Sequence, residues 1–146
     1  MRRIMGALIL IVGLVPQAWA DTATAVRTLA EQGDAKAQYA LGTMYRDGQG
    51  VTQDHTEAVR WWRSAAEQGV LDATLALGNA YAGGAGIARD NVQAYMWFDI
   101  ASRQSGDDWL RGIAGSNRDA IAARMSPAEI SKAQGLAADW TARHAK

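Results

Sequence analysis

The sequence contains no cysteine, so disulfide bonds, thiolate metal ligands and a cysteine nucleophile are all excluded. Histidine is also scarce. Neither His55 nor His144 has a second histidine three or four positions away, and we therefore expect no metal site. The 15 basic and 15 acidic side chains balance, which leaves no electrostatic basis for binding nucleic acid.

Motifs of catalysis are missing as well. The sequence has no G-x-S-x-G or S-x-x-K stretch that would mark a serine nucleophile. The glycine pairs at 48/50 and 84/86 lack the lysine of a phosphate-binding loop, so we interpret them as structural. The acidic pair Asp107–Asp108 is better placed to cap a helix than to act as an acid/base pair. We expect no catalytic residue and no cofactor, and predict that the chain is not an enzyme.

The N-terminal residues are typical of a secretory signal peptide. Two arginines precede an apolar run from Ile4 to Val15, and Ala18-Trp19-Ala20 supplies the small residues of a cleavage site. The run is shorter than the ~20 residues of a spanning helix, although an uncleaved anchor is the alternative. We predict a signal peptide over residues 1–20, cleaved after Ala20. The mature chain, 21–146, would then be periplasmic or secreted, with no stable membrane insertion.

One segment occurs nearly twice. "AEQGDAKAQYALG" begins at Ala30, and "AEQGVLDATLALG" begins 36 positions later at Ala66. A fixed period of this size is the signature of a solenoid built from helical pairs. The sequence therefore predicts one repeat over residues 34–69 and a second over 70–105.

Each repeat reads as two helices. Apolar residues recur at helical spacing from about Asp34 to Arg46, and a glycine-containing loop then ends the first helix. Asp54 and Glu57 are spaced as the start of a second helix, whose apolar stripe includes Trp61. The second repeat shows the same pattern from Asp90 onward.

Small and large residues alternate in a way that predicts close helix packing. A mid-helix glycine costs about 1 kcal/mol of helix propensity, so Gly42 and Gly78 are expected where a neighbouring ring leaves no room for a methyl group. Trp62 and Phe98 are expected to join the core, with a stacking platform for sugars or peptides as the alternative. The predicted repeat core comprises the matching apolar positions Ala40, Leu41, Gly42, Tyr45, Trp61, Ala76, Leu77, Gly78, Tyr81 and Trp97.

The two ends of the repeat array are expected to differ from its middle. Residues 22–32 read as the second helix of an incomplete unit, with Ala25 and Leu29 in the places of Trp61 and Ala65. Residues 107–144 read as a divergent helical hairpin, whose second helix starts at Ser126-Pro127. Seven helices and no strand are expected.

The motif A-E-Q-G-D-A-x-A-Q-Y-x-L-G-x-x-Y-x-x-G-x-G-V, followed by D-x-x-x-A-x-x-W-x-x-x-A-A-E-Q-G, resembles the Sel-one-like repeat (SLR) family. The tail from Asn117 to Trp140 resembles the closing segment of exported bacterial members. This resemblance implies an all-α fold: a short right-handed α/α solenoid of SLR or tetratricopeptide-like hairpins. It also implies scaffolding of envelope complexes, modulation of a sensor's periplasmic domain, or a role in secretion or host interaction, and the residues do not choose among these. Cysteine-rich relatives linked to β-lactams are a poor guide here, since this chain lacks their cysteines.

A solenoid of this kind presents a concave face lined by the first helix of each repeat, and such a face suits a peptide or a partner helix. We predict binding of another protein, from the envelope or periplasm, at the residues of that face: Lys36, Tyr39, Thr43, Arg46, Asp72, Leu75 and Asn79. A protein that binds or hydrolyses cell-wall fragments or β-lactams is one alternative. Weak self-association through the solenoid ends is another, the chain being otherwise a monomer.

Overall fold

The computed structural model describes residues 16–145, which form seven α-helices and no strand. None of these helices is long and apolar enough to cross a membrane. Most of the predicted signal peptide, residues 1–15, lies outside the described range. The helices are α1 (Gln17–Glu31), α2 (Ala35–Asp47), α3 (His55–Glu67), α4 (Leu71–Gly83), α5 (Asn91–Gln104), α6 (Asp108–Ala122) and α7 (Pro127–His144).

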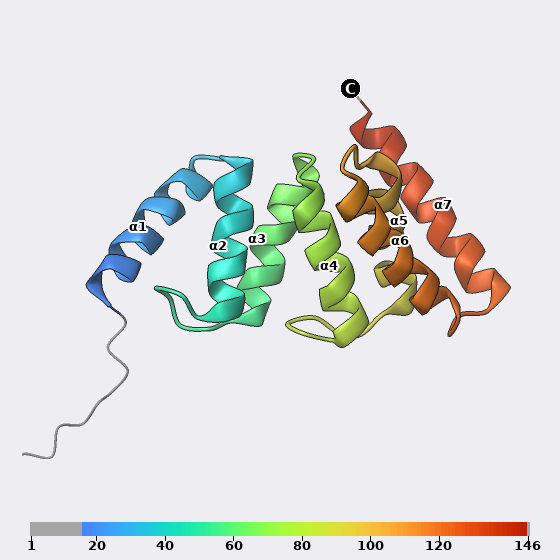
Figure 1. Cartoon of the computed structure of the whole chain (residues 1–146), viewed down its shortest axis with the longest axis horizontal. Helices are drawn as coiled ribbons and strands as arrows, with labels where there is room; N and C mark the ends of the chain where they lie inside the picture. Colours follow the sequence, from blue (N-terminus) through green and yellow to red (C-terminus); the bar gives the residue numbers. More distant parts are fainter. Residues whose placement is uncertain (1–15, 146) are drawn as a thin grey trace, which may run out of the picture.

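The helices stack side by side into a solenoid (Figure 1). From α1 to α6, each helix packs against the next one in the chain, and neighbours run in opposite directions. The first helices of the units, α2, α4 and α6, therefore run the same way, and their first turns lie at the same end of the stack.

Equivalent residues start and end the helices of the two repeats. Asp54 and Asp90 cap α3 and α5 by accepting hydrogen bonds from backbone N–H groups of the first turn. Gly48 and Gly84 end α2 and α4 with φ angles of 68° and 71°, a left-handed conformation that glycine adopts without steric strain. The predicted repeat therefore carries its own start and stop signals.

The glycines at the centres of α2 and α4 each lie against a ring. A Cβ on Gly42 would stand 2.5 Å from Cδ1 of Trp62, and a Cβ on Gly78 would stand 2.5 Å from Cδ1 of Phe98. The predicted core residues Leu41, Gly42, Trp61, Leu77, Gly78, Tyr81 and Trp97 are buried, and Ala40, Tyr45 and Ala76 are half-buried. Trp62 and Phe98 are buried too, at 4% and 1% exposure, which leaves no open stacking platform at Phe98.

A ladder of arginine–tyrosine hydrogen bonds joins successive units. Arg27 of α1 donates to the hydroxyl of Tyr45 at 2.8 Å, and Arg63 of α3 donates to the hydroxyl of Tyr81 at 2.8 Å. The two pairs are 36 positions apart. Each bond runs from the second helix of one unit to the first helix of the next.

The N-terminal helix begins earlier than the sequence predicts. α1 starts at Gln17 rather than Thr22, so its first turn overlaps the predicted signal peptide. The Trp19 carbonyl lies against Gly50, and 36 positions later the His55 carbonyl lies against Gly86. The 36-residue correspondence between units therefore already holds at Trp19. Leu29, which occupies a core position in this register, is 49% exposed, because no described helix precedes α1.

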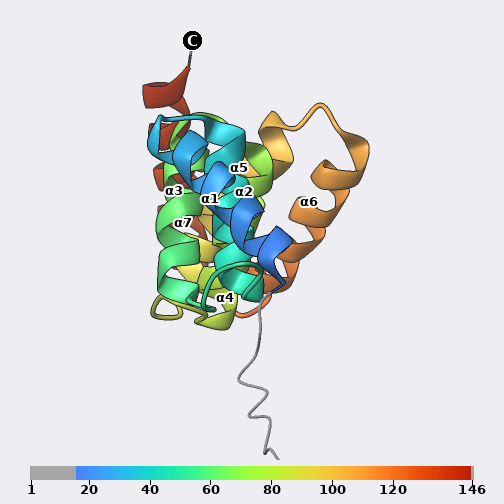
Figure 2. The ribbon, with the colours of Figure 1, turned by 90° about the vertical axis from the view of Figure 1, so that its left-hand side faces the viewer.

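The prediction of a C-terminal hairpin over residues 107–144 is wrong in its packing. α6 and α7 follow one another in the chain, but both pack extensively on α5 and scarcely on each other. Figure 2 shows them on different sides of the stack. The reason is that α5 is buried around its circumference: nine consecutive residues, Ala94 to Ser102, are buried, and seven of them are apolar. Such a helix requires cover on more than one side.

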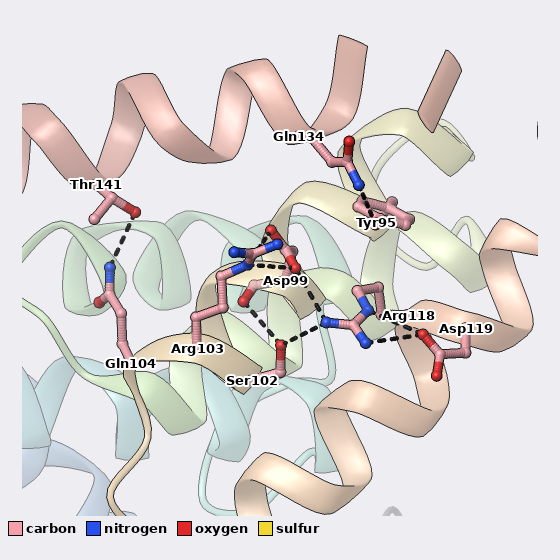
Figure 3. Close-up of polar contacts among 9 residues, drawn as sticks. All are labelled: Tyr95, Asp99, Ser102, Arg103, Gln104, Arg118, Asp119, Gln134 and Thr141. Carbon is pink, nitrogen blue, oxygen red and sulfur yellow. Dashed lines mark hydrogen bonds and ion pairs between the residues drawn. The ribbon is translucent and has the colours of Figure 1, made fainter. Parts of the chain in front are cut away.

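Polar side chains fix this arrangement (Figure 3). Asp99 of α5, only 2% exposed, accepts from Arg103 Nε at 2.8 Å and from Arg118 Nη1 of α6 at 3.1 Å. On the α7 side, Gln134 donates to the Tyr95 hydroxyl at 3.2 Å, and Gln104 donates to Thr141 at 3.1 Å. The buried carboxylate is thereby neutralised, and both neighbouring helices are tied to α5.

Candidate functional site

A groove of about 300 Å³ lies between the two repeats. We call it the α2–α4 groove. Side chains from both first helices line it, with Trp62 contributed by α3 and Trp109 by α6. The full lining is Tyr39, Arg46, His55, Trp62, Asp72, Leu75, Ala76, Asn79, Ala80, Ala85 and Trp109.

The groove brings together most of the residues predicted for the binding face. It contains Tyr39 and Arg46 from the first repeat, and Asp72, Leu75 and Asn79 from the second. The other two predicted residues lie outside the lining. Lys36 is exposed in the first turn of α2, and Thr43 is half-buried and donates to the Tyr39 carbonyl at 3.2 Å.

Three aromatic lining residues are absent from the predicted site residues. Trp62, expected in the core, is buried and still presents part of its ring to the groove. His55, the first residue of α3, has no sequence signal beyond its position in a first helical turn. Trp109 belongs to the divergent C-terminal segment, where the 36-residue period no longer relates one position to another.

The groove is built on a fixed frame. Trp62 lies against Gly42 of α2, so its ring is held between α2 and α3. On the opposite wall, the Asn117 side chain of α6 donates to Asn79 of α4 at 3.3 Å. The lining side chains are therefore presented by packed helices, with Ala85 alone coming from a loop.

The two charged ends of the groove differ. At the end formed by the last turn of α2, Arg46 Nε and Nη2 donate to the Asp47 carboxylate at 2.7 and 2.9 Å. These hydrogen bonds raise the pKa of Arg46 and lower the pKa of Asp47, so both groups are charged and neutralise each other. Asp72 lies in the first turn of α4, is exposed, and has no ion-pair partner among the described residues.

The chemistry of the lining suits binding. Across residues 16–145, no three histidine or acidic side chains gather as potential metal ligands. His144 pairs with Glu67 through a 2.6 Å contact, but neither residue lines the groove. What the groove offers is apolar and aromatic surface with a few polar groups at its edges, an arrangement suited to binding a side chain.

A second hollow lies between α5 and α7, with a volume of about 570 Å³. Alanines form much of its lining, together with Asp99 and Arg103, which are bonded to each other. It has no aromatic side chain and no unpaired charge, so the α2–α4 groove remains the better candidate for a binding site.

Comparisons with known proteins agree on the repeat. The family model for the Sel1 repeat matches residues 35–70 and 71–106. A protective antigen with an SLR fold, present in uropathogenic Escherichia coli strains, shares 30% identity at a TM-score of 0.81 and covers 92% of this chain. This chain spans 28% of that antigen's length.

A Sel1 repeat protein from Oxalobacter formigenes is a second structural relative. It shares 36% identity at a TM-score of 0.58 and covers 59% of this chain, which spans 66% of its length. No curated protein sequence matches the chain.

Proposed function

This chain is a Sel1-repeat protein, and from that premise we propose that it acts as a non-enzymatic adaptor or regulator that binds another protein in the α2–α4 groove. The observation that carries the proposal is the convergence of Tyr39, Leu75 and Trp109, from three different helices, on one groove. Aromatic side chains held on rigid helices are the anchors that most often dominate protein interfaces. SLR-fold proteins are typically protein-interaction scaffolds, and this supports the proposal.

We further propose that the protein works in the periplasm or outside the cell, in contact with an envelope partner. The support is the sequence pattern of the first 20 residues. Cleavage after Ala20 would remove the first turn of α1, which begins at Gln17. Mass spectrometry of the protein recovered from a periplasmic extract tests this: a chain beginning at Asp21 is expected, and an intact N-terminus in the cytoplasmic fraction would contradict it.

A pull-down tests the binding function. Tagged wild-type chain is compared with the Tyr39→Ala/Arg46→Ala double variant, after both have been shown to melt at similar temperatures. The matched control is Arg124→Ala/Lys132→Ala, two exposed basic residues outside the groove. We expect one protein to be retained by the wild type and the control and lost by the groove variant.

Other outcomes would point elsewhere. A partner recovered equally by all three proteins would contradict the groove as the binding site. If no protein is recovered, the adaptor function fails, and binding of cell-wall fragments or β-lactams becomes the function to test. Light scattering at high protein concentration tests self-association separately, because a chain that stays monomeric would contradict that alternative.

A further inference from the structure

Trp109 is unusually exposed for a tryptophan that lines a groove. Its exposed fraction is 68%, the highest among the large apolar residues of the described chain. It lies in the first turn of α6, at the same end of the stack as Asp72 in the first turn of α4. A largely exposed indole ring thus lies at the edge of a groove that also contains Asp72, a carboxylate without an ion-pair partner among the described residues.

The charges around this end are predominantly acidic. Asp107 and Asp108 directly precede Trp109, and only Asp108 has a basic partner, Arg111. Asp72 adds a further negative charge that no described side chain neutralises. Lys36 also lies at this end, but it projects from α2 outside the groove lining.

The opposite end carries no comparable charge. The basic residues of the lining at this end are His55 and Arg46, and the Arg46 guanidinium is already engaged by Asp47 through two hydrogen bonds. A partner's carboxylate at this end would have to compete with Asp47. A partner's cation at the other end would meet Asp72 without competition, so charge complementarity favours a basic occupant.

We propose that the α2–α4 groove binds a lysine or arginine side chain of a protein partner, with the cationic head held between Asp72 and the face of Trp109. The aliphatic stem of such a side chain would lie along Tyr39 and Leu75, because long basic side chains cover apolar surface while their heads stay polar. A cation over an indole face is attracted by the ring electrons, and the nearby carboxylate adds to this attraction. The inference rests on the proposed protein-binding function and names the chemistry of the partner.

The test is selection of peptides from a random twelve-residue display library on the immobilised full chain. Five proteins are compared: the wild type, Tyr39→Ala, Asp72→Asn, Asp72→Lys and Trp109→Ala. The control is Asp139→Asn, which removes the same charge from an exposed position of α7 outside the groove. Because Asp72 and Trp109 are both exposed, these variants are expected to fold, and a thermal melt of each confirms it.

The wild type and Asp139→Asn are expected to enrich peptides that carry lysine or arginine beside an apolar residue. Asp72→Asn should lower the affinity for a selected peptide by about tenfold at low ionic strength. The loss should be smaller at high salt, since exposed charges are screened. Asp72→Lys should reverse the preference toward acidic peptides. Trp109→Ala should weaken binding of the same peptide.

The outcomes distinguish the chemistry of the occupant from groove binding as such. The selected peptides could instead be apolar or acidic, compete with one another and no longer bind Tyr39→Ala. That result would overturn the proposal of a basic side chain in the groove and leave groove binding intact. Basic peptides that bind all the variants equally would overturn the assignment to Asp72 and Trp109. A library without any enriched peptide would overturn groove binding itself, and this inference with it.

Discussion

His144, at the end of α7, contacts Glu67, at the end of α3, with 2.6 Å between Nε2 and the carboxylate oxygen. Its other ring nitrogen, Nδ1, lies 2.8 Å from the Trp140 carbonyl oxygen. Both nitrogens thus face acceptors, and only the protonated ring can donate to both. The imidazole also stacks on Trp140, with ring centroids 4.0 Å apart.

This geometry predicts a pH-dependent contribution to stability. The Trp140 carbonyl, followed by Glu67, raises the pKa of His144 above its ordinary value, against opposing effects of burial and of Arg143. A raised pKa in the folded state gives stabilisation that is complete below about pH 6.5 and is lost as the pH rises through the folded pKa. The free energy of unfolding of the wild type should therefore exceed that of His144→Gln more at about pH 5.5 than at about pH 8.5. Denaturant titrations at both pH values measure it, and an equal difference would contradict the ion pair.

A glycine that lies against an aromatic ring and one with open space around it should respond in opposite ways to substitution by alanine. Gly42→Ala places a methyl group against Trp62 and should destabilise the chain by about 1–2 kcal/mol, because overpacking outweighs the gain in helix propensity. Gly135 lies within α7 with no atom near its Cβ position, so Gly135→Ala should stabilise by up to about 1 kcal/mol. Chemical denaturation of both variants decides the matter. A stabilising effect of Gly42→Ala would contradict the close approach of α2 and α3.

Two tryptophans of the same size should behave differently when truncated. Trp97 is 5% exposed and packs edge-to-face on Trp140 at 5.8 Å, so Trp97→Ala should cost about 3–5 kcal/mol. Trp109→Ala should change stability by less than about 0.5 kcal/mol, because that side chain faces solvent. Thermal unfolding compares the two, and similar melting temperatures would overturn the distinction between core and groove.

Removing the arginine partners of Asp99 should cost more stability than removing the buried carboxylate itself. Removing both arginines in Arg103→Ala/Arg118→Ala leaves a buried charge without compensation and should cost about 3 kcal/mol or more. Asp99→Asn should cost less, since the Arg103 side chain is 66% exposed and can turn to water. Denaturant unfolding of both variants at neutral pH tests this. A larger loss for Asp99→Asn would show that the network, rather than the desolvated charge, dominates.

The repeat makes much of the fold predictable. Residues 36 positions apart experience similar surroundings, so a small residue and a ring that recur together, such as Gly42 with Trp62, indicate a contact from the sequence alone. Five predicted site residues line the groove for a related reason: their positions off the apolar stripe of α2 and α4 follow from helical spacing.

Beyond Ser105 this logic no longer applies. The sequence between 107 and 144 indicates helices but not their neighbours, and hairpin packing is expected there only by analogy with the repeats. The run of apolar residues from Ala94 to Phe98 in α5 is the signal against it, because five consecutive apolar residues point to all sides of a helix and one packed neighbour could not cover them. The contribution of Trp109 to the groove depends on the placement of α6, and it is unpredictable from the sequence for the same reason.

The arginine–tyrosine ladder also records how the molecule could lengthen. Arg63 meets Tyr81 as Arg27 meets Tyr45, so a duplicated copy of residues 35–70 inserted after Val70 would find a matching donor and acceptor at both new junctions. At the next step of the ladder, Asp99 stands where an arginine would be, and it accepts from Arg118. The hydrogen-bond polarity is reversed there, so a copy added after α5 would lack the arginine donor at its first junction. The ladder therefore favours insertion of modules within the array over addition at its C-terminal end.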